Sequence, residues 1–319
     1  MDVLQKVINE INKSSGDNII GFAKDLNIDV EHISTGSVSL DWATGGGLPK
    51  GRITELYGPY SSGKTLIALK TIAEAQKQDI PCVFIDAELS FEKDHALAAG
   101  VNLEKLILVQ LAAGEKMFDL IRKFITEIPT GLIVIDSVAA IVPEYEDSNE
   151  TDKQTMALTA RLMSKGLRII NGINKPNVGW AVVFINQIRE KIGVMYGNPE
   201  TTPGGRALGF FSSIRVEIRA GERYMEGKER IGQEIRFKVQ KSKICTPHRD
   251  GSFRYIYANG IDEVGDIISL ALQLKIMEQA GAWYTIADER FQGRMAIEAK
   301  AKEEPEFLEK IKAMIAEKQ

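Results

Sequence analysis

The chain has 319 residues, of which 44% are hydrophobic and 26% are charged, as in an ordinary soluble globular protein. Its net charge of −4 means that an anionic partner has to meet a local basic surface. Two cysteines exclude a disulfide framework, and the segment from Cys245 to His248 offers only half of a metal site, so no cage of metal ligands is expected. No signal peptide or membrane-spanning run is recognisable, which predicts a cytoplasmic protein.

The first element in the chain is a predicted amphipathic helix. Its apolar residues fall on one helical face: Val3, Leu4, Val7, Ile8 and Ile11. The loop sequence NKSSGDN follows the helix. A short helix that a loop separates from the remaining chain is typical of an arm, so residues 1–30 are expected to lie outside the main core.

From Arg52 to Asn186 the pattern alternates between strands and helices. The predicted strands are RITELY, CVFID, LILVQ, LIVID and WAVVFIN, and helices are predicted between them over residues 64–78, 91–99, 115–128 and 153–173. Strands that are apolar throughout, separated by helices of this length, predict a mostly parallel sheet with helices on both faces. The predicted fold class is therefore α/β.

Beyond Phe211 the apolar residues alternate with polar ones in SIRVEIRAG, QEIRFKVQKSK and SFRYIYANG, as in antiparallel strands at a sheet edge. A helix is then predicted from Asp262 to Ala280, followed by GAWYTI and a Lys/Glu-rich helix from Glu306. The expected organisation is an arm (residues 1–30), a core (residues 31–261) and a small α+β C-terminal domain (residues 262–319).

The segment GPYSSGKT, from Gly58 to Thr65, matches the phosphate-loop pattern and lies between a predicted strand and a predicted helix. Backbone N–H groups of such a loop and the helix N-terminus bind phosphate oxygens. The lysine reaches the β- and γ-phosphates, and the hydroxyl after it helps to hold Mg²⁺. The candidate nucleotide-binding residues in this loop are Gly58, Ser61, Ser62, Gly63, Lys64 and Thr65.

Carboxylates follow two other core strands. Asp136 ends LIVID, where it suits a second Mg²⁺ position, and Glu88 follows CVFID. Because parallel strands end at the same sheet edge, both are expected near Lys64. Hydrolysis of a γ-phosphate needs a base that orients water; Glu88 is our candidate, and Asp86 is the competing one.

A long glycine- and proline-rich stretch, QIREKIGVMYGNPETTPGG, follows the last core strand and begins at Gln187. Compact domains rarely use so many residues for a connection without a function. Arg189 and Lys191 can meet phosphates, and Ile192 and Met195 can wedge against bases of a single strand. A surface loop without a ligand is the alternative interpretation.

Several segments together resemble the bacterial RecA recombinase family: STGSVSLDWATGGGLPKGRITELYGPYSSGKT, VFIDAE, LIVIDSVAAIVP, VVFINQIREKIGVMYGNPETTPGGRAL and GAWY. The resemblance extends over nearly the whole chain, and the stretch after Gln187 is more specific than the phosphate loop. It implies a DNA-dependent ATPase that uses ATP and Mg²⁺, forms a helical filament on single-stranded DNA and exchanges strands with homologous duplex DNA. It also implies a scaffold for the self-cleavage of a LexA-like repressor.

The resemblance also assigns roles to individual residues. Glu88 and Lys64 match catalytic positions, Gln187 matches the γ-phosphate sensor, and His95 occupies the position that stacks on adenine. Lys241 and Lys243 match lysines that reach the ATP of the neighbouring subunit, and the N-terminal helix matches the arm that docks on it. The implied DNA contacts are Arg161, Ser164, Arg168, Arg189, Lys191, Ile192, Met195, Gly204, Gly205 and Arg206.

The chain departs from the family pattern at several positions. The first DNA loop, EYEDSNETDKQT, is acidic and lacks glycine, His95 replaces a tyrosine, and Pro203 and Arg206 flank the glycine pair. The acidic tail of many relatives is not recognisable. These differences indicate a divergent member, and a mobile-element or phage version is one interpretation. A ring-forming motor or helicase and a regulatory DNA-binding filament are the alternative functions.

Overall fold

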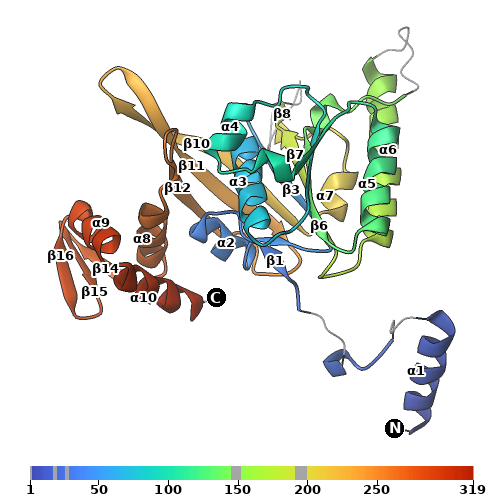
Figure 1. The fold of residues 1–319 in the computed structure, drawn as a ribbon, viewed down its shortest axis with the longest axis horizontal. Helices are drawn as coiled ribbons and strands as arrows, with labels where there is room; N and C mark the ends of the chain where they lie inside the picture. The colour runs from blue at the N-terminus through green and yellow to red at the C-terminus, as the bar shows by residue number, and fades with distance from the viewer. Residues whose placement is uncertain (1, 17–19, 26–28, 145–151, 191–199, 319) are drawn as a thin grey trace.

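The computed structural model describes residues 2–16, 20–25, 29–144, 152–190 and 200–318 (Figure 1). Within these residues the largest sheet has nine strands in the order β13–β12–β11–β10–β3–β7–β6–β4–β5. In chain order its strands are β3 (Ile53–Gly58), β4 (Cys82–Asp86), β5 (Leu106–Gln110), β6 (Gly131–Asp136), β7 (Trp180–Gln187), β10 (Ile214–Glu226), β11 (Glu229–Ser242), β12 (Asp250–Ile256) and β13 (Gly260–Ile261).

The predicted α/β class is confirmed. Every neighbouring pair from β10 to β5 is parallel, whereas the pairs from β10 to β13 are antiparallel and form one edge of the sheet. The two longest antiparallel strands, β10 and β11, extend beyond the sheet as a hairpin that projects at the upper left of Figure 1.

Helices cover both faces of the parallel part, as the sequence predicts. Alternate residues of β6 point to opposite faces, so Leu132 and Val134 pack in the cluster with α3 (Lys64–Lys77), and Ile133 and Ile135 pack in the other. The second cluster contains residues of α5 (Gly114–Glu127), α6 (Asp152–Ile173) and α7 (Ala207–Phe211). The central strands β3, β4, β6 and β7 are almost wholly buried, which explains their continuous apolar runs, whereas the edge strand β5 is largely exposed.

Short elements connect these layers. They are η1 (Ala23–Asp25), β1 (His32–Ile33), α2 (Val38–Thr44), β2 (Leu48–Pro49), α4 (Lys93–Ala98), η2 (Leu103–Lys105), η3 (Val138–Ala140), β8 (Arg189–Glu190) and β9 (Glu200–Thr201). None of the helices in the described ranges is long and apolar enough to cross a bilayer.

The predicted N-terminal helix is present as α1 (Asp2–Ser15). Its apolar residues Val3, Leu4, Val7 and Ile11 are exposed, from 37% to 76%. Figure 1 shows α1 away from the central sheet. An apolar stripe that the rest of the chain leaves uncovered is a surface suited to a partner.

The C-terminal part has its own apolar cluster, built around Ile268, Tyr284 and Ile311. Its elements are α8 (Glu263–Gln273), β14 (Met277–Ala280), β15 (Trp283–Ile286), β16 (Glu289–Gln292), α9 (Arg294–Glu303) and α10 (Pro305–Ala316).

The prediction of one helix from Asp262 to Ala280 is wrong in its second half. The helix α8 ends at Gln273, and Lys275 adopts a left-handed conformation with φ 57°. Residues 277–280 then pair with β15 as an antiparallel strand. Only Gly281 and Ala282 separate β14 from β15, and Gly281 has φ 61°, so a tight hairpin overrides the helical period here.

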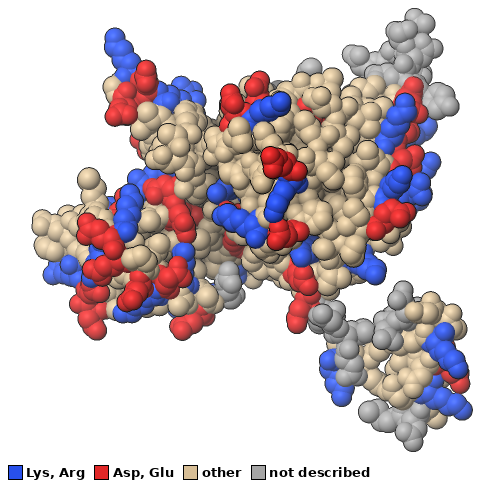
Figure 2. Space-filling model, viewed as in Figure 1, with Lys and Arg blue, Asp and Glu red and all other residues tan. Residues whose placement is uncertain are grey.

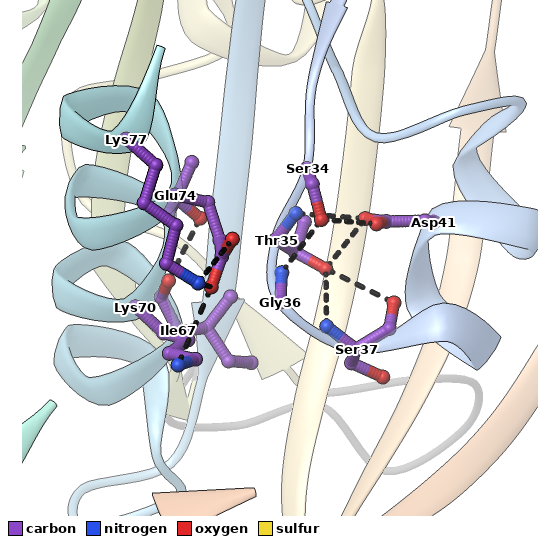
Figure 3. A network of polar contacts seen from close by, with 10 residues as sticks. Ser34, Thr35, Gly36, Ser37, Asp41, Ile67, Lys70, Glu74 and Lys77 are labelled. Atoms are coloured by element: carbon purple, nitrogen blue, oxygen red, sulfur yellow. Dashed lines mark hydrogen bonds and ion pairs between the residues drawn. The ribbon is translucent and has the colours of Figure 1, made fainter. Parts of the chain in front are cut away.

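Buried polar groups join α2 to α8. Asp41 accepts hydrogen bonds from the hydroxyls of Ser34 (2.6 Å) and Thr35 (2.7 Å), as Figure 3 shows. Ser37, the N-cap of α2, donates to Asp266 Oδ2 on α8 at 2.8 Å. The other carboxyl oxygen, Asp266 Oδ1, is buried without a hydrogen-bond partner among the described residues. Burial raises the pKa of Asp266 from 3.8 to about 6.

We predict that Asp266→Asn stabilises the chain at pH 8 but not at pH 4. Because the folded-state pKa of Asp266 is raised, its stability contribution is greatest below the unfolded value and falls as pH rises toward 6. Removing the buried charge should increase the free energy of unfolding by about 2 kcal/mol at pH 8. Urea unfolding at both pH values, with exposed Asp288→Asn as control, measures this. Equal destabilisation at both pH values would contradict it.

Candidate nucleotide site and DNA-facing surface

The candidate catalytic residues lie at one edge of the sheet, where four parallel strands end. Asp86 of β4 is in register with Asp136 of β6, and Gly58 of β3 is in register with Gln187 of β7. The parallel register therefore places the ends of these strands together, beside the N-terminus of α3.

The phosphate loop leads from β3 into α3. Gly63, the N-cap of α3, has φ 97°, and a Cβ atom there would lie 2.7 Å from Ile235 Cδ1. Glycine is required because the loop turns with positive φ while touching β11. The loop leaves backbone N–H groups at the helix N-terminus, an arrangement that suits an anion such as a phosphate.

Lys64 is buried, and its Nζ donates to the carbonyl oxygens of Pro59 (2.6 Å) and Gly58 (3.2 Å). Burial lowers the pKa of Lys64, while the carboxylates of Asp136 and Glu88 oppose that shift. A buried ammonium group whose partners are mainly neutral carbonyls is suited to an anionic ligand.

Thr65 and Asp136 form an oxygen pair beside Lys64. The Thr65 hydroxyl donates to Asp136 Oδ2 at 2.6 Å. Burial is the main reason why the pKa of Asp136 is raised to about 6, and the hydrogen bond from Thr65 offsets part of that rise. A hydroxyl and a carboxylate are oxygen ligands that Mg²⁺ accepts together with waters and phosphate oxygens. These residues therefore fit the magnesium ion of a nucleoside triphosphate.

Glu88 and Gln187 are in direct contact. Gln187 Nε2 donates to Glu88 Oε1 at 3.0 Å, and the Ser137 hydroxyl donates to the same oxygen. Glu88 is exposed at the pocket, so its carboxylate can accept a proton from a water molecule there.

The competing base, Asp86, is occupied by structural contacts. It is buried, and its carboxylate accepts hydrogen bonds from the backbone N–H groups of Ser90 and Phe91, both at 3.0 Å. These bonds fix the chain after Glu88 and satisfy the carboxylate oxygens. The geometry therefore favours Glu88 over Asp86 as the base.

A pocket of about 360 Å³ contains these groups. His95 from α4 is exposed and contributes to the lining. The sequence interpretation missed Gln233, Tyr255 and Tyr257, which line the same pocket from β11 and the end of β12. Aromatic side chains at such a site can stack on a base. Ser137 was also missed, although it directly follows Asp136.

The candidate DNA residues on α6 lie on one exposed face. Arg161, Ser164 and Arg168 are all exposed. Lys and Arg side chains, with acidic ones between them, occupy the edge of the molecule formed by α5 and α6 in Figure 2. A face of this kind can contact a phosphate backbone.

The glycine pair packs against the same helix. Gly204 (φ 81°) and Gly205 (φ 75°) both have positive φ, and a Cβ atom on Gly205 would lie 3.0 Å from Ala160 Cβ. Arg206 follows as an exposed residue. The residue after Ala160 is Arg161, so the chain returns from its long loop beside the α6 face.

The remaining loop candidates are only partly described. Exposed Arg189 lies in β8, which pairs with β9 on the return of the loop. Lys191, Ile192 and Met195 lie outside the described residues, as do residues 145–151 of the first loop.

A largely buried ion pair anchors the loop that follows Gln187 to the sheet. Glu55 is fully buried and accepts from Arg215 Nε at 2.5 Å and from Asn186 Nδ2 at 3.0 Å. Asn186 Nδ2 also donates to the Pro203 carbonyl at 3.2 Å. Asn186 directly precedes Gln187, so both ends of the loop are tied to the sheet next to the candidate catalytic groups.

Lys241 and Lys243 lie elsewhere. Lys241 Nζ donates to the carbonyls of Gly209 (2.7 Å) and Phe210 (3.0 Å), and Lys243 Nζ donates to Phe210 at 3.3 Å. Both lysines, Lys241 near the end of β11 and Lys243 directly after that strand, thus bind carbonyls of α7, and the described lining of the pocket does not include them.

Comparison with known proteins matches the whole chain to two family models. Residues 2–262 match the RecA N-terminal domain, and residues 265–319 match the RecA C-terminal domain. The chain is 42% identical over 318 residues to the protein RecA of Ectopseudomonas oleovorans, covering 99% of this chain and 91% of that protein. It is 43% identical over 316 residues to the protein RecA of Acholeplasma laidlawii, covering 98% and 95%.

We predict that Lys64→Ala and Glu88→Gln separate binding from hydrolysis. Lys64→Ala removes the buried cation, so magnesium-ATP should bind about 10- to 100-fold more weakly. Glu88→Gln keeps the shape of the site but not its base, so ATP should still bind while hydrolysis falls by about 100-fold or more. Calorimetric titration and phosphate release measure the two effects. Equal loss of binding in both variants would contradict the assignment.

Proposed function

Because this chain belongs to the RecA family, we propose that it is a DNA-dependent ATPase that polymerises on single-stranded DNA and pairs it with homologous duplex DNA in recombination and repair. The observation that carries the proposal is the hydrogen bond between Gln187 and Glu88. It joins Glu88, the candidate general base in the nucleotide pocket, to Gln187, the first residue of the long loop.

Each catalytic group has a task that its position supports. Lys64 binds the phosphates and neutralises charge, and Thr65 and Asp136 hold the magnesium ion that ATP brings. Glu88 orients a water molecule and accepts its proton. The Ser137 hydroxyl and the Gln187 amide hold the carboxylate of Glu88 in place.

Gln187 couples this chemistry to DNA. Its amide can donate either to Glu88 or to a phosphate oxygen, and the loop that follows is anchored at its far end through Pro203 and Asn186. A single strand that binds the loop therefore changes the position of the Gln187 side chain, and with it the freedom of the Glu88 carboxylate. The nucleotide and DNA sites thus favour each other.

We propose that DNA lies against the exposed face of α6 and the glycine pair. Arg161, Ser164 and Arg168 contact phosphates together with Arg189 and Arg206, while Gly204 and Gly205 present backbone N–H groups. The family likeness extends the same role to Lys191, Ile192 and Met195. Binding in this manner is independent of base sequence, because pairing between strands reads the sequence.

The filament follows from head-to-tail contacts between copies. The exposed apolar stripe of α1 supports docking on the next subunit, and a contact of two different surfaces builds an open helix. Lys241 and Lys243, exchanging the α7 carbonyls for phosphate, would reach the nucleotide of the neighbour. The assembled filament would also present a surface to a LexA-like repressor.

We also propose that the chain acts in the cytoplasm, and that it divides into an arm (residues 1–30), an ATPase core (residues 31–261) and a C-terminal domain (residues 262–319). The separate apolar cluster after residue 262 supports the last boundary.

The first experiment measures ATP hydrolysis with and without single-stranded DNA. We expect strong stimulation by the single strand, weak stimulation by duplex DNA, and loss of stimulation in Gln187→Ala. The control Gln78→Ala removes an exposed glutamine at the C-terminal end of α3. DNA-independent hydrolysis by discrete rings would favour a motor, and filaments without hydrolysis would favour a regulatory scaffold.

The DNA-facing surface has its own test. In Arg161→Ala or Arg168→Ala, the slope of log affinity for single-stranded DNA against log salt should decrease by about 0.7, the effect of one lost phosphate contact. Fluorescence anisotropy over a series of salt concentrations measures the slope. Arg122→Ala on α5 is the matched control, since its exposed guanidinium lies near Asp119. An unchanged slope in the α6 variants would refute the contact.

A further inference from the structure

One arginine of the β10–β11 hairpin touches two side chains of the nucleotide pocket. The guanidinium of Arg230 lies over the Tyr257 ring, 5.8 Å from its centroid, and its Nη2 donates to the side-chain oxygen of Gln233. Tyr257 and Gln233 both line the pocket, whereas Arg230 stands behind them on β11.

This placement differs from that of an ordinary surface arginine. Arg230 is exposed, and Glu226 and Glu229 lie in the same hairpin. Among the described residues, however, Arg230 makes no ion pair with a carboxylate, and its partners are the tyrosine and the glutamine. The guanidinium is therefore held against the wall of the pocket.

The wall that Arg230 supports is the one that suits a base. Lys64 and the loop around it suit phosphates, which leaves the remaining lining for a nucleotide base, and that lining includes His95, Ala98 and Tyr257. Tyr257 is 43% exposed, so its ring has a free surface to stack on a base. The other stacking candidate, His95, offers only a small imidazole ring.

Given the proposed ATPase function, we propose that Arg230 is a positioning residue for the nucleotide base. It fixes the Tyr257 ring by a cation–π contact and keeps the Gln233 side chain in place, so that the base meets a wall that is already ordered. This support compensates for the limited stacking area of His95.

Binding of magnesium-ADP and of inorganic tripolyphosphate to the full chain tests the proposal. In Arg230→Ala, the Kd for ADP should rise about three- to fivefold, the size of an exposed cation–π contact. The Kd for tripolyphosphate, which has no base, should not change. The control Lys228→Ala removes a cation from the same hairpin and should leave both values as they are.

Further variants separate positioning from a structural effect. Arg230→Lys keeps the cation and should recover part of the affinity. In the Tyr257→Leu background, Arg230→Ala should cause no further loss, because the ring through which it acts is absent. At saturating ATP the kcat of Arg230→Ala should equal that of the unaltered chain, with only KM raised.

Three results would overturn the proposal: an unchanged Kd for ADP in Arg230→Ala, an equal loss for ADP and tripolyphosphate, or a full additional loss in the Tyr257→Leu background. The proposed function itself would be refuted if the unaltered chain bound no ADP, or if the Lys64→Ala variant bound ADP as tightly as the unaltered chain.

Discussion

The parallel register of β3, β7, β6 and β4 is the constraint on which the site depends. It brings residues from positions 58 to 187 of the chain to one sheet edge, although each arrives from a different strand–helix unit. Two packed faces hold the strands rigidly, so the backbone at Lys64, Asp136, Glu88 and Gln187 is placed with little freedom. A catalytic group that is positioned before its ligand arrives loses little entropy on binding.

The same edge also anchors the loop that follows Gln187. The buried carboxylate of Glu55 binds both Arg215 and Asn186, and Asn186 in turn binds the Pro203 carbonyl. An uncompensated charge in this position would be costly, so the three groups have to stay together. The backbone on both sides of the loop is therefore tied to the sheet beside Glu88, at Asn186 and at Pro203.

Local patterns predicted most of the core but less of the C-terminal domain. Long apolar strands and amphipathic helices have strong periods, and the elements from β3 to β7 match them. The composition of residues 277–280 continues the pattern of α8 and predicts a helix there. Its pairing with β15 decides otherwise, and short half-exposed strands carry too few residues for a period to appear.

The sequence by itself determined those candidate residues that lie within a single turn or at the end of a single strand. The phosphate loop, the aspartate at the end of β6 and the glutamine at the end of β7 are all local signals with a fixed structural context. Only the tertiary structure decided which groups meet. The carboxylate of Asp86 is occupied by hydrogen bonds from backbone N–H groups. Gln233 and Tyr257 line the pocket, and Arg230 contacts both of them. These contacts depend on the order of strands in the sheet, and that order arises from packing between segments that are distant in the chain.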